Sequence, residues 1–461
     1  MSGLLLFQVT RLRDRLWPLL TRKPDLIRWV LLATLALGVA VSVAGALHYR
    51  RVAVEATQYQ SAQPPPIQLR VSYRDDPQKL PGLLRYERAL EANYRAADAF
   101  LSRYFQSNNS ADYYYLQFAF DGALSMYEAG GDLHWLDLVV TRGFAITERA
   151  QRRLDGELGW KWMNPRTGRD TTVTEDSILC ELQFSRPLLR AARLAGRLTA
   201  YRHSREAKAL SSFVLDHVLA KWFDRRAGAA GVQRPDILAR DPWFVRVEAQ
   251  RGWEALISKA ANLRHPWLDT WSMAAMLYID AYMVTGVEEY RERAALLARL
   301  FKQRQKIASD GAWIWDEASH VGAWSESSHN SAGAPDTSHA NREAAWVVHA
   351  FLAGIGFDRA DVAALGATFR QRLYLGKTSQ GFANYITGQN TPYRRLGPGE
   401  GMVFDGWARL AWVLPDVYVA LDGLWHQRVT TDEQTMNGTI WADLSLPGHL
   451  ALAEALHNAA R

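Results

Sequence analysis

The stretch DYYYLQFAFDGALSMYEAGGD (112–132) decides the fold. Its apolar residues recur with a helical period, and it ends in Gly-Gly-Asp (130–132), which favours a tight turn followed by a new helix start. The chain after this turn keeps the same period. The sequence therefore predicts a helical hairpin over 113–154.

Looser copies of this hairpin follow along the chain, each with a short internal turn. They span 176–219, 268–307 and 337–375. A fifth unit begins at 402–421 and is completed by 446–456, and 83–105 is the expected partner in a sixth. Long loops separate the units, at 155–174, 223–266, 308–336 and 376–401, and a further insertion is expected at 422–445.

Five to six hairpins with long loops on one side predict an all-α fold, an (α/α)5-6 toroid, over 82–461. Strands are expected only as small pieces in the loops. Inner helices begin after the long loops, so their N-termini are expected to meet at the cleft. Loops of this length in a compact domain are usually functional.

Two motifs resemble a known superfamily. The 112–132 stretch resembles the helix-then-Gly-Asp-turn units of six-hairpin carbohydrate-active proteins, which include glycosidases, polysaccharide lyases and sugar epimerases. PDTSHANREAA (335–345) is similar to an Asp-x-Ser-His-Ala/Gly-Asn signature in relatives of glucuronyl C5-epimerases. The resemblance implies the toroid fold and action on a carbohydrate, but this fold hosts several chemistries.

The net charge of +6 arises in the N-terminal segment. Residues 1–51 hold eight basic and two acidic residues, which accounts for the whole excess. The rest is balanced, so no nucleic-acid partner is expected. The single cysteine, Cys180, excludes an intrachain disulfide framework and a cysteine-based zinc finger.

The apolar run 29–47 carries no charge and is long enough for a bilayer core of about 30 Å. Basic residues are more frequent before it than after it, which orients the N-terminus to the cytoplasm. The sequence thus predicts a basic cytoplasmic segment (1–28), a transmembrane anchor (29–48) contacting the lipid bilayer, a Pro/Gln-containing spacer (49–81) and the toroid. The expected location is the inner membrane, single-pass, with the C-terminal domain in the periplasm. A cleaved signal peptide ending at 44–46 is the alternative.

His339 is the first catalytic candidate. It is expected in the first turn of an inner helix, where the helix dipole favours a neutral imidazole able to act as a base. Glu343, one turn later, is expected to hold the other ring nitrogen, and Arg342 to bind substrate. The alternative is a capping histidine beside an Arg-Glu ion pair.

Two loop stretches supply further candidates. In NLRHPWLDTW (262–271), Asn262 is expected to share a substrate carboxylate's charge, with Arg264 and His265 binding it. In NYITGQNTPYRR (384–395), Tyr385 is expected to transfer a proton, with its pKa lowered by a neighbouring cation such as Arg394. The alternatives are ordinary loop capping and aromatic packing.

Loop tryptophans and one helix start complete the predicted substrate-binding set. Indoles stack on sugar rings, and pairs two residues apart present both rings on one face of an extended chain. Core packing is the alternative for about half of them. The candidates are Trp160, Trp162, Trp313, Trp315, Asp405 and Trp407.

The predicted function is that of a carbohydrate-active enzyme acting on a uronate-containing polysaccharide by β-elimination. Lyases need a base, a charge-neutralising group and often a tyrosine. A glycoside hydrolase with two carboxylates from Glu175, Asp176, Asp269, Glu343 and Asp405 is the close alternative. A uronate C5-epimerase, or a non-catalytic glycan-binding scaffold in an envelope polysaccharide synthesis or export complex, also remains open. No metal and no cofactor are expected.

Overall fold

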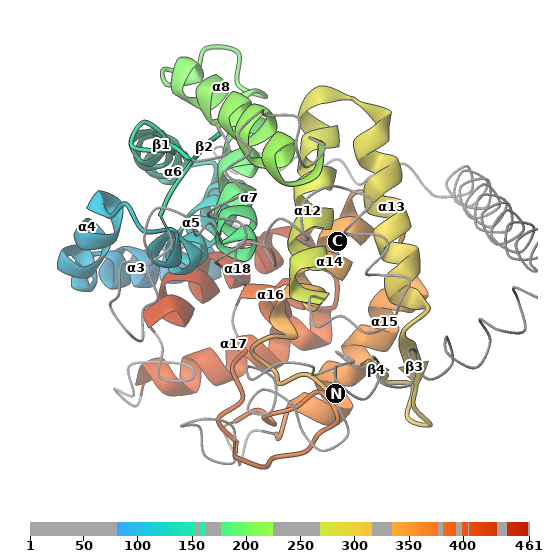
Figure 1. The fold of residues 1–461 in the computed structure, drawn as a ribbon. Coiled ribbons are helices and arrows are strands. Elements are labelled where there is room, and N and C mark those ends of the chain that lie inside the picture. Colours follow the sequence, from blue (N-terminus) through green and yellow to red (C-terminus); the bar gives the residue numbers. More distant parts are fainter. Residues whose placement is uncertain are drawn as a thin grey trace, which may run out of the picture. The chain divides into compact units, whose positions relative to one another are not determined.

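The chain is mostly helical in the computed structural model, in agreement with the predicted all-α class (Figure 1). It divides into two units, Met1–Gln63 and Pro64–Arg461. This boundary falls inside the predicted spacer. The structure describes residues of the second unit, namely 81–153, 157–161, 177–224, 268–315, 334–376, 381–392, 399–403, 405–430 and 440–459.

Helices that follow one another along the chain pack in pairs, as the repeat predicts. The first four pairs are α5 (Ser110–Gly130) with α6 (Leu133–Thr147), α7 (Ile178–Ala195) with α8 (Ser204–Phe213), α12 (Leu268–Thr285) with α13 (Glu288–Lys302), and α14 (Asn341–Leu352) with α15 (Arg359–Thr368). A π-helical turn extends α8 (η2, Val214–Asp224) and another extends α15 (η3, Phe369–Leu373).

The last two pairs differ from this pattern. Helix α16 (Asp405–Arg409) continues as a 3₁₀ turn (η4, Leu410–Trp412) that packs on α17 (Pro415–Thr430). Helix α18 (Ile440–Ala459) packs on α3 (Pro81–Ala96), which α4 (Asp98–Gln106) follows. The two ends of the described chain therefore form one pair. The predicted insertion at 422–445 is shorter than expected, because α17 and α18 both extend into it.

Six elements, here called the central helices, contact one another in succession: α5, α7, α12, α14, α16 and α18, with α18 returning to α5. They are the more buried members of their pairs. In α7, for example, even Glu181, Arg186 and Arg190 are buried. A helix that is buried on all sides places its polar side chains in the interior, where they need partners.

Local sequence signals account for the turns. Gly131 has a φ of 73° and caps α5, and the Asp132 side chain accepts the His134 backbone N–H at the start of α6. Asp358 and Asp361 form a capping box at the start of α15. These are the places where the sequence predicts helix boundaries.

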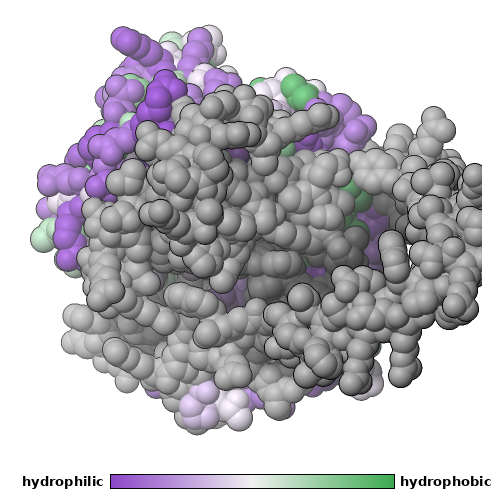
Figure 2. Space-filling model, in the orientation of Figure 1, coloured by the Kyte–Doolittle hydropathy of each residue, from purple (hydrophilic) through white to green (hydrophobic). Residues whose placement is uncertain are grey.

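Strands are short among the described residues, as predicted. β1 (Gln151–Arg152) pairs antiparallel with β2 (Leu158–Gly159), and β3 (Gln305–Ile307) pairs antiparallel with β4 (Trp313–Trp315). Hydrophilic residues, purple in Figure 2, predominate on the described surface visible in that view.

The predicted membrane anchor, 29–47, lies outside the described residues. Among the residues that are described, no helix is both long and apolar enough to cross a membrane. This finding stands against the predicted single-pass inner-membrane location with a periplasmic C-terminal domain, since the described part of the chain supplies no spanning helix.

Close packing of α5 on α18 leads to a stability prediction. A methyl group at Gly122 would overlap the carbonyl oxygen of Leu444, so Gly122→Ala is expected to destabilise the fold by about 1–3 kcal/mol. The matched control is Gly423→Ala in α17, where no atom lies within 4 Å of the added methyl. There the better helix propensity should stabilise by about 0.5–1 kcal/mol. Urea denaturation measures both changes, and equal effects would contradict the packing argument.

Candidate functional site

The segment before α14 holds the sequence motif with His339. Residues 337–340 form a turn, and α14 begins at Asn341, so His339 precedes the helix rather than lying in its first turn. Asp336 orders this turn: its Oδ1 accepts the backbone N–H of Ser338 (2.9 Å) and of His339 (3.2 Å). The three-residue spacing brings the carboxylate and the imidazole together.

Asp336 also holds the His339 ring, because its Oδ2 accepts the proton on Nδ1. The Asp336 side chain is 1% exposed and that of His339 is 24% exposed. Burial alone would raise the pKa of Asp336, but the charge and hydrogen bonds of His339, with help from Ser338, lower it below its ordinary value. The carboxylate is therefore ionised, and it selects the tautomer whose basic lone pair is on Nε2.

Glu343 has a different partner from the predicted one. It is buried in α14, and its Oε1 accepts a hydrogen bond from Ser272 of α12 at 2.8 Å. The carboxylate that holds His339 is that of Asp336. The prediction that Glu343 holds the His339 ring failed. Asp336 lies three residues before His339, within reach of the same turn, whereas the Glu343 side chain points to α12.

Tyr385 lies beside this turn. Its backbone pairs with that of Asp336, and the Thr337 N–H donates to the Asn384 carbonyl at 2.8 Å. Burial raises the pKa of Tyr385, and the charge of Asp336 adds to this, against a lowering by a hydrogen bond to Thr391. The predicted lowering of this pKa is therefore wrong, and Tyr385 is protonated near neutral pH.

Arg342 lies one turn after His339 and reaches across to two other central helices. Its Nε donates to Gln183 Oε1 of α7 at 3.0 Å. Its Nη2 donates to the hydroxyl of Tyr114 on α5, and the guanidinium lies 5.4 Å from the centre of the Tyr114 ring. A positive charge is thus held at the junction of α5, α7 and α14.

Half-buried aromatic rings, here called the aromatic strip, extend from this junction. Tyr114 contacts Tyr115 (centroids 4.9 Å apart), and Tyr115 stacks on Trp441 at the start of α18 (5.6 Å). Trp441 also contacts Phe100 (5.2 Å) and Tyr104 (5.5 Å) of α4. None of the site residues predicted from the sequence lies in this strip, although the run Tyr113-Tyr114-Tyr115 was a signal for it.

The predicted sugar-stacking tryptophans that the structure describes are core residues. Trp160, Trp313, Trp315 and Trp407 are between 0 and 4% exposed. Trp315 stacks on Trp407, and the indole N–H of Trp407 donates to the Thr337 carbonyl. No ring face is available for a sugar, because helices from several hairpins cover these indoles.

Five predicted site residues lie outside the described residues: Asn262, Arg264, His265, Trp162 and Arg394.

Asp405, predicted to bind substrate, instead belongs to a buried group of charges between the central helices. Its carboxylate contacts Arg409 (3.0 Å), His449 (2.9 Å) and Arg186 (3.6 Å). Burial alone would raise the pKa of Asp405, but the charge of Arg409, the hydrogen bond from His449 and the charge of Arg186 lower it well below its ordinary value. With all these partners inside the protein, this carboxylate is structural.

Asp121 of α5 is the centre of this buried group, here called the polar column. Its members are Asp121, Arg186, Arg190, Asp405, Arg409 and His449. The Asp121 carboxylate contacts Arg186 and Arg190 (3.1 Å) of α7 and Arg409 (3.0 Å) of α16. Burial lowers the pKa of His449 to about 4, so its ring is neutral and donates its Nε2 proton to Asp405. The column joins four central helices, α5, α7, α16 and α18, through buried polar side chains.

Asp443, in the first turn of α18, leads to a pH prediction. Burial raises the pKa of this carboxyl from 3.8 to about 7. Between these two pH values the folded protein keeps a proton that the unfolded chain has already released. Its stability contribution is present below pH ~4 and is lost as the pH rises to about 7. Asp443→Asn should remove this loss, about 2 kcal/mol between pH 5 and pH 8. Urea denaturation at both pH values tests this. An equal change in unfolding free energy between pH 5 and pH 8 for the original chain and for Asp443→Asn would contradict it.

Within the described ranges, no group of three or more His, Cys, Asp or Glu residues is arranged to hold a metal ion. Cys180, the single cysteine of the sequence, is buried.

Comparison of the chain with protein-family models, curated proteins and solved structures gives no match.

Proposed function

We propose that the chain folds as an α/α toroid and cleaves a uronate-containing polysaccharide by β-elimination. The toroid is supported by the closed succession of central helices, in which α18 packs on both α5 and α3. The starts of three central helices meet. Arg342, at the start of α14, reaches Tyr114 near the start of α5, and Trp441, at the start of α18, stacks on Tyr115.

The observation that carries the proposal is the pairing of a partly exposed His339 with the buried, ionised Asp336. A carboxylate on Nδ1 orients an imidazole and makes Nε2 a better base. Most described carboxylates and histidines of the central helices are committed to interior partners. The His339 side chain, in contrast, is 24% exposed.

The chemistry assigns a role to each group. In β-elimination the base removes the proton at C5 of the uronate, a C4–C5 double bond forms, and the C4–O bond breaks. His339 Nε2 takes the C5 proton. Tyr385, protonated because burial raises its pKa, donates a proton to the leaving oxygen. Arg342 stabilises the charge that develops on the uronate carboxylate.

The aromatic strip supports a carbohydrate as the substrate. Sugar rings present apolar faces that stack on aromatic side chains, and the strip offers partly exposed rings from Phe100 to Tyr114. Because it leads toward Arg342, a polysaccharide bound along it would place an acidic sugar near the cation.

A screen of anionic and neutral polysaccharides tests the proposal. The expected result is new ultraviolet absorbance from an unsaturated uronate, with a matching number of new reducing ends. Reducing ends without absorbance would contradict a lyase. Exchange of the C5 proton with deuterated water, without cleavage, would identify an epimerase instead.

A glycoside hydrolase is the second candidate, because Asp443 has the pKa expected of a general acid. It lies two residues after Trp441 of the aromatic strip. In that case Asp443→Asn would abolish cleavage, whereas the lyase proposal expects it to retain most activity.

A further inference from the structure

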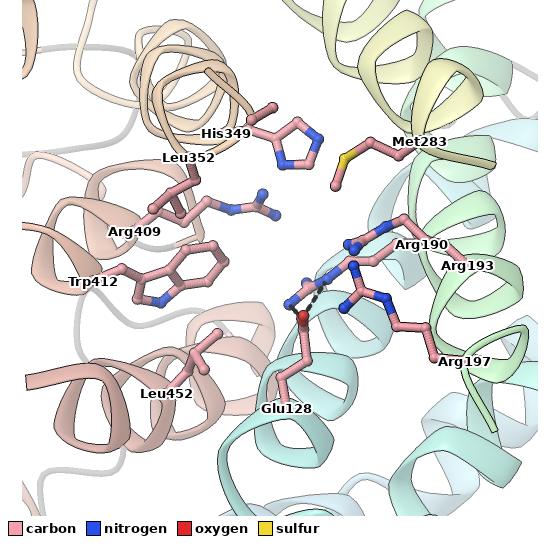
Figure 3. Close-up of a pocket in the computed structure, with 11 residues that line it drawn as sticks. Glu128, Arg190, Arg193, Arg197, Met283, His349, Leu352, Arg409, Trp412 and Leu452 are labelled. Carbon is pink, nitrogen blue, oxygen red and sulfur yellow. Dashed lines mark hydrogen bonds and ion pairs between the residues drawn. The ribbon is translucent and has the colours of Figure 1, made fainter. Parts of the chain in front are cut away.

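The polar groups at the two ends of the central helices are held in different ways. Toward the C-terminal ends lies a cavity of about 70 Å³, where charged side chains pair with one another, as Arg190 does with Glu128 (Figure 3). At the opposite end, where α14 begins, His339 and Tyr385 belong to separate segments that are joined by backbone hydrogen bonds. Their relative position therefore depends on how firmly these two segments are held together.

The two segments pair through an antiparallel bridge between Asp336 and Tyr385. Backbone hydrogen bonds flank this bridge. The residue after Asp336 donates to the residue before Tyr385 at 2.8 Å, and the residue after Tyr385 donates to the residue before Asp336 at 3.3 Å. Residues paired in this way have Cα atoms about 4.5 Å apart and side chains on the same face. Tyr385 therefore lies beside the carboxylate that holds the His339 ring.

Thr337 adds a side-chain hydrogen bond to this pairing. Its Oγ1 donates to the Ala383 carbonyl at 2.5 Å, one residue before the carbonyl that its own N–H binds. Ala383 is itself anchored, because its N–H donates to the Leu373 carbonyl at the end of η3 at 2.8 Å. The hydroxyl thus ties the turn before α14 to a fixed part of the segment that carries Tyr385.

The carbonyl of Thr337 holds the turn from the other side. It accepts the indole N–H of Trp407 of α16 at 3.0 Å and the side-chain amide of Asn341 at 3.2 Å. Thr337 is 0% exposed, so it does not touch a substrate. Any effect of its side chain on catalysis must therefore act through the position of its neighbours.

We propose that Thr337 is a positioning residue, whose hydroxyl holds the His339 turn and Tyr385 at the spacing that proton transfer requires. This role rests on the proposed function, in which these two side chains exchange protons with the substrate. Each must lie within hydrogen-bonding distance of the atom it serves, and a misplacement of about 1 Å can cost about 10²-fold in rate.

A series of substitutions at Thr337 tests the role of the hydroxyl. Thr337→Ser keeps it, Thr337→Cys leaves a weak donor, and Thr337→Val replaces it by a methyl group. The kcat on a uronate polysaccharide should fall about 10- to 100-fold in Thr337→Val with little change in KM, because a buried residue acts on turnover and not on binding. Thr337→Ser should keep most of the rate, and Thr337→Cys should be intermediate. The cysteine variant preserves the comparison if Thr337→Val does not fold.

Thr368→Val is the matched control. Thr368, the last residue of α15, is also 0% exposed, and its hydroxyl donates to the Trp313 carbonyl of β4 at 2.7 Å. Thr368→Val therefore removes a buried hydrogen bond of the same kind away from the His339 turn. It should lower the midpoint of urea denaturation about as much as Thr337→Val does, but leave kcat unchanged.

Hydrogen exchange followed by mass spectrometry tests the junction without a substrate. Amides of 334–340 and 382–388 should exchange about 10-fold or more faster in Thr337→Val than in the original chain, and at the original rate in Thr337→Ser and Thr368→Val. Unchanged exchange in Thr337→Val, faster exchange with unchanged kcat, or an equal loss of kcat in Thr368→Val would each overturn the inference. If the original chain cleaves no uronate polysaccharide, the proposed function fails, whereas the exchange rates still decide whether the hydroxyl holds the two segments together.

Discussion

Replacing His339 by alanine is expected to lower turnover on a uronate polysaccharide by about 10²- to 10⁴-fold, because it removes the general base. The stability should change little, since the side chain is partly exposed and precedes α14. Initial rates from the unsaturated product, with urea denaturation of the same samples, measure the two effects. Asp336→Asn should also reduce turnover, because an amide no longer selects the Nδ1–H tautomer.

His134→Ala is the matched control, since this histidine is exposed on α6 and should have no effect on rate. Tyr385→Phe should reduce turnover more than it raises KM, as expected for loss of a proton donor. If His339→Ala kept nearly full activity while Asp443→Asn lost it, the lyase proposal would be wrong and a hydrolase would be favoured.

Replacing Asp121 by asparagine is expected to destabilise the fold by about 3–5 kcal/mol, because Arg186, Arg190 and Arg409 all lose a buried counter-charge. The side chain keeps its shape, so packing alone does not account for such a loss. The midpoint and slope of urea denaturation measure it.

Glu288→Gln provides the control for Asp121→Asn. It breaks an ion pair with Arg291 (2.7 Å) in which the Glu288 side chain is 52% exposed, and such pairs contribute about 0–1 kcal/mol. A similar small loss for both variants would mean that the polar column adds little to stability.

Local sequence determined the helices and several of their ends. The 3.6-residue apolar period predicts α5, and Gly131 with Asp132 marks its end and the start of α6, because a left-handed residue and a capping carboxylate act within one turn. The motif around His339 could be recognised for the same reason. Its partner Asp336 lies three residues away, within reach of one turn of chain.

The prediction for the tryptophans failed because burial is not a local property. The alternation of Trp313 and Trp315 is the same for a ligand-facing strand and a core strand. Here both rings are buried, with Trp407 stacked on Trp315 and Phe357 against Trp313. Asp405 was misjudged for a similar reason. An acidic residue at a helix start looks like a cap or a site, until His449 of α18 and Arg186 of α7 are brought against it.

The sequence by itself therefore determined the all-α class, the hairpin repeat and the His339 motif, since each depends on residues a few positions apart. Only the tertiary structure decided which polar side chains face one another between the central helices. Asp121, Arg186 and Arg409 come from three helices separated by many residues, and their charges are compatible with burial only after packing pairs them. The same packing buried the tryptophans and put Trp441 beside Tyr115, because side-chain contacts between distant segments arise from how the helices pack and not from local spacing.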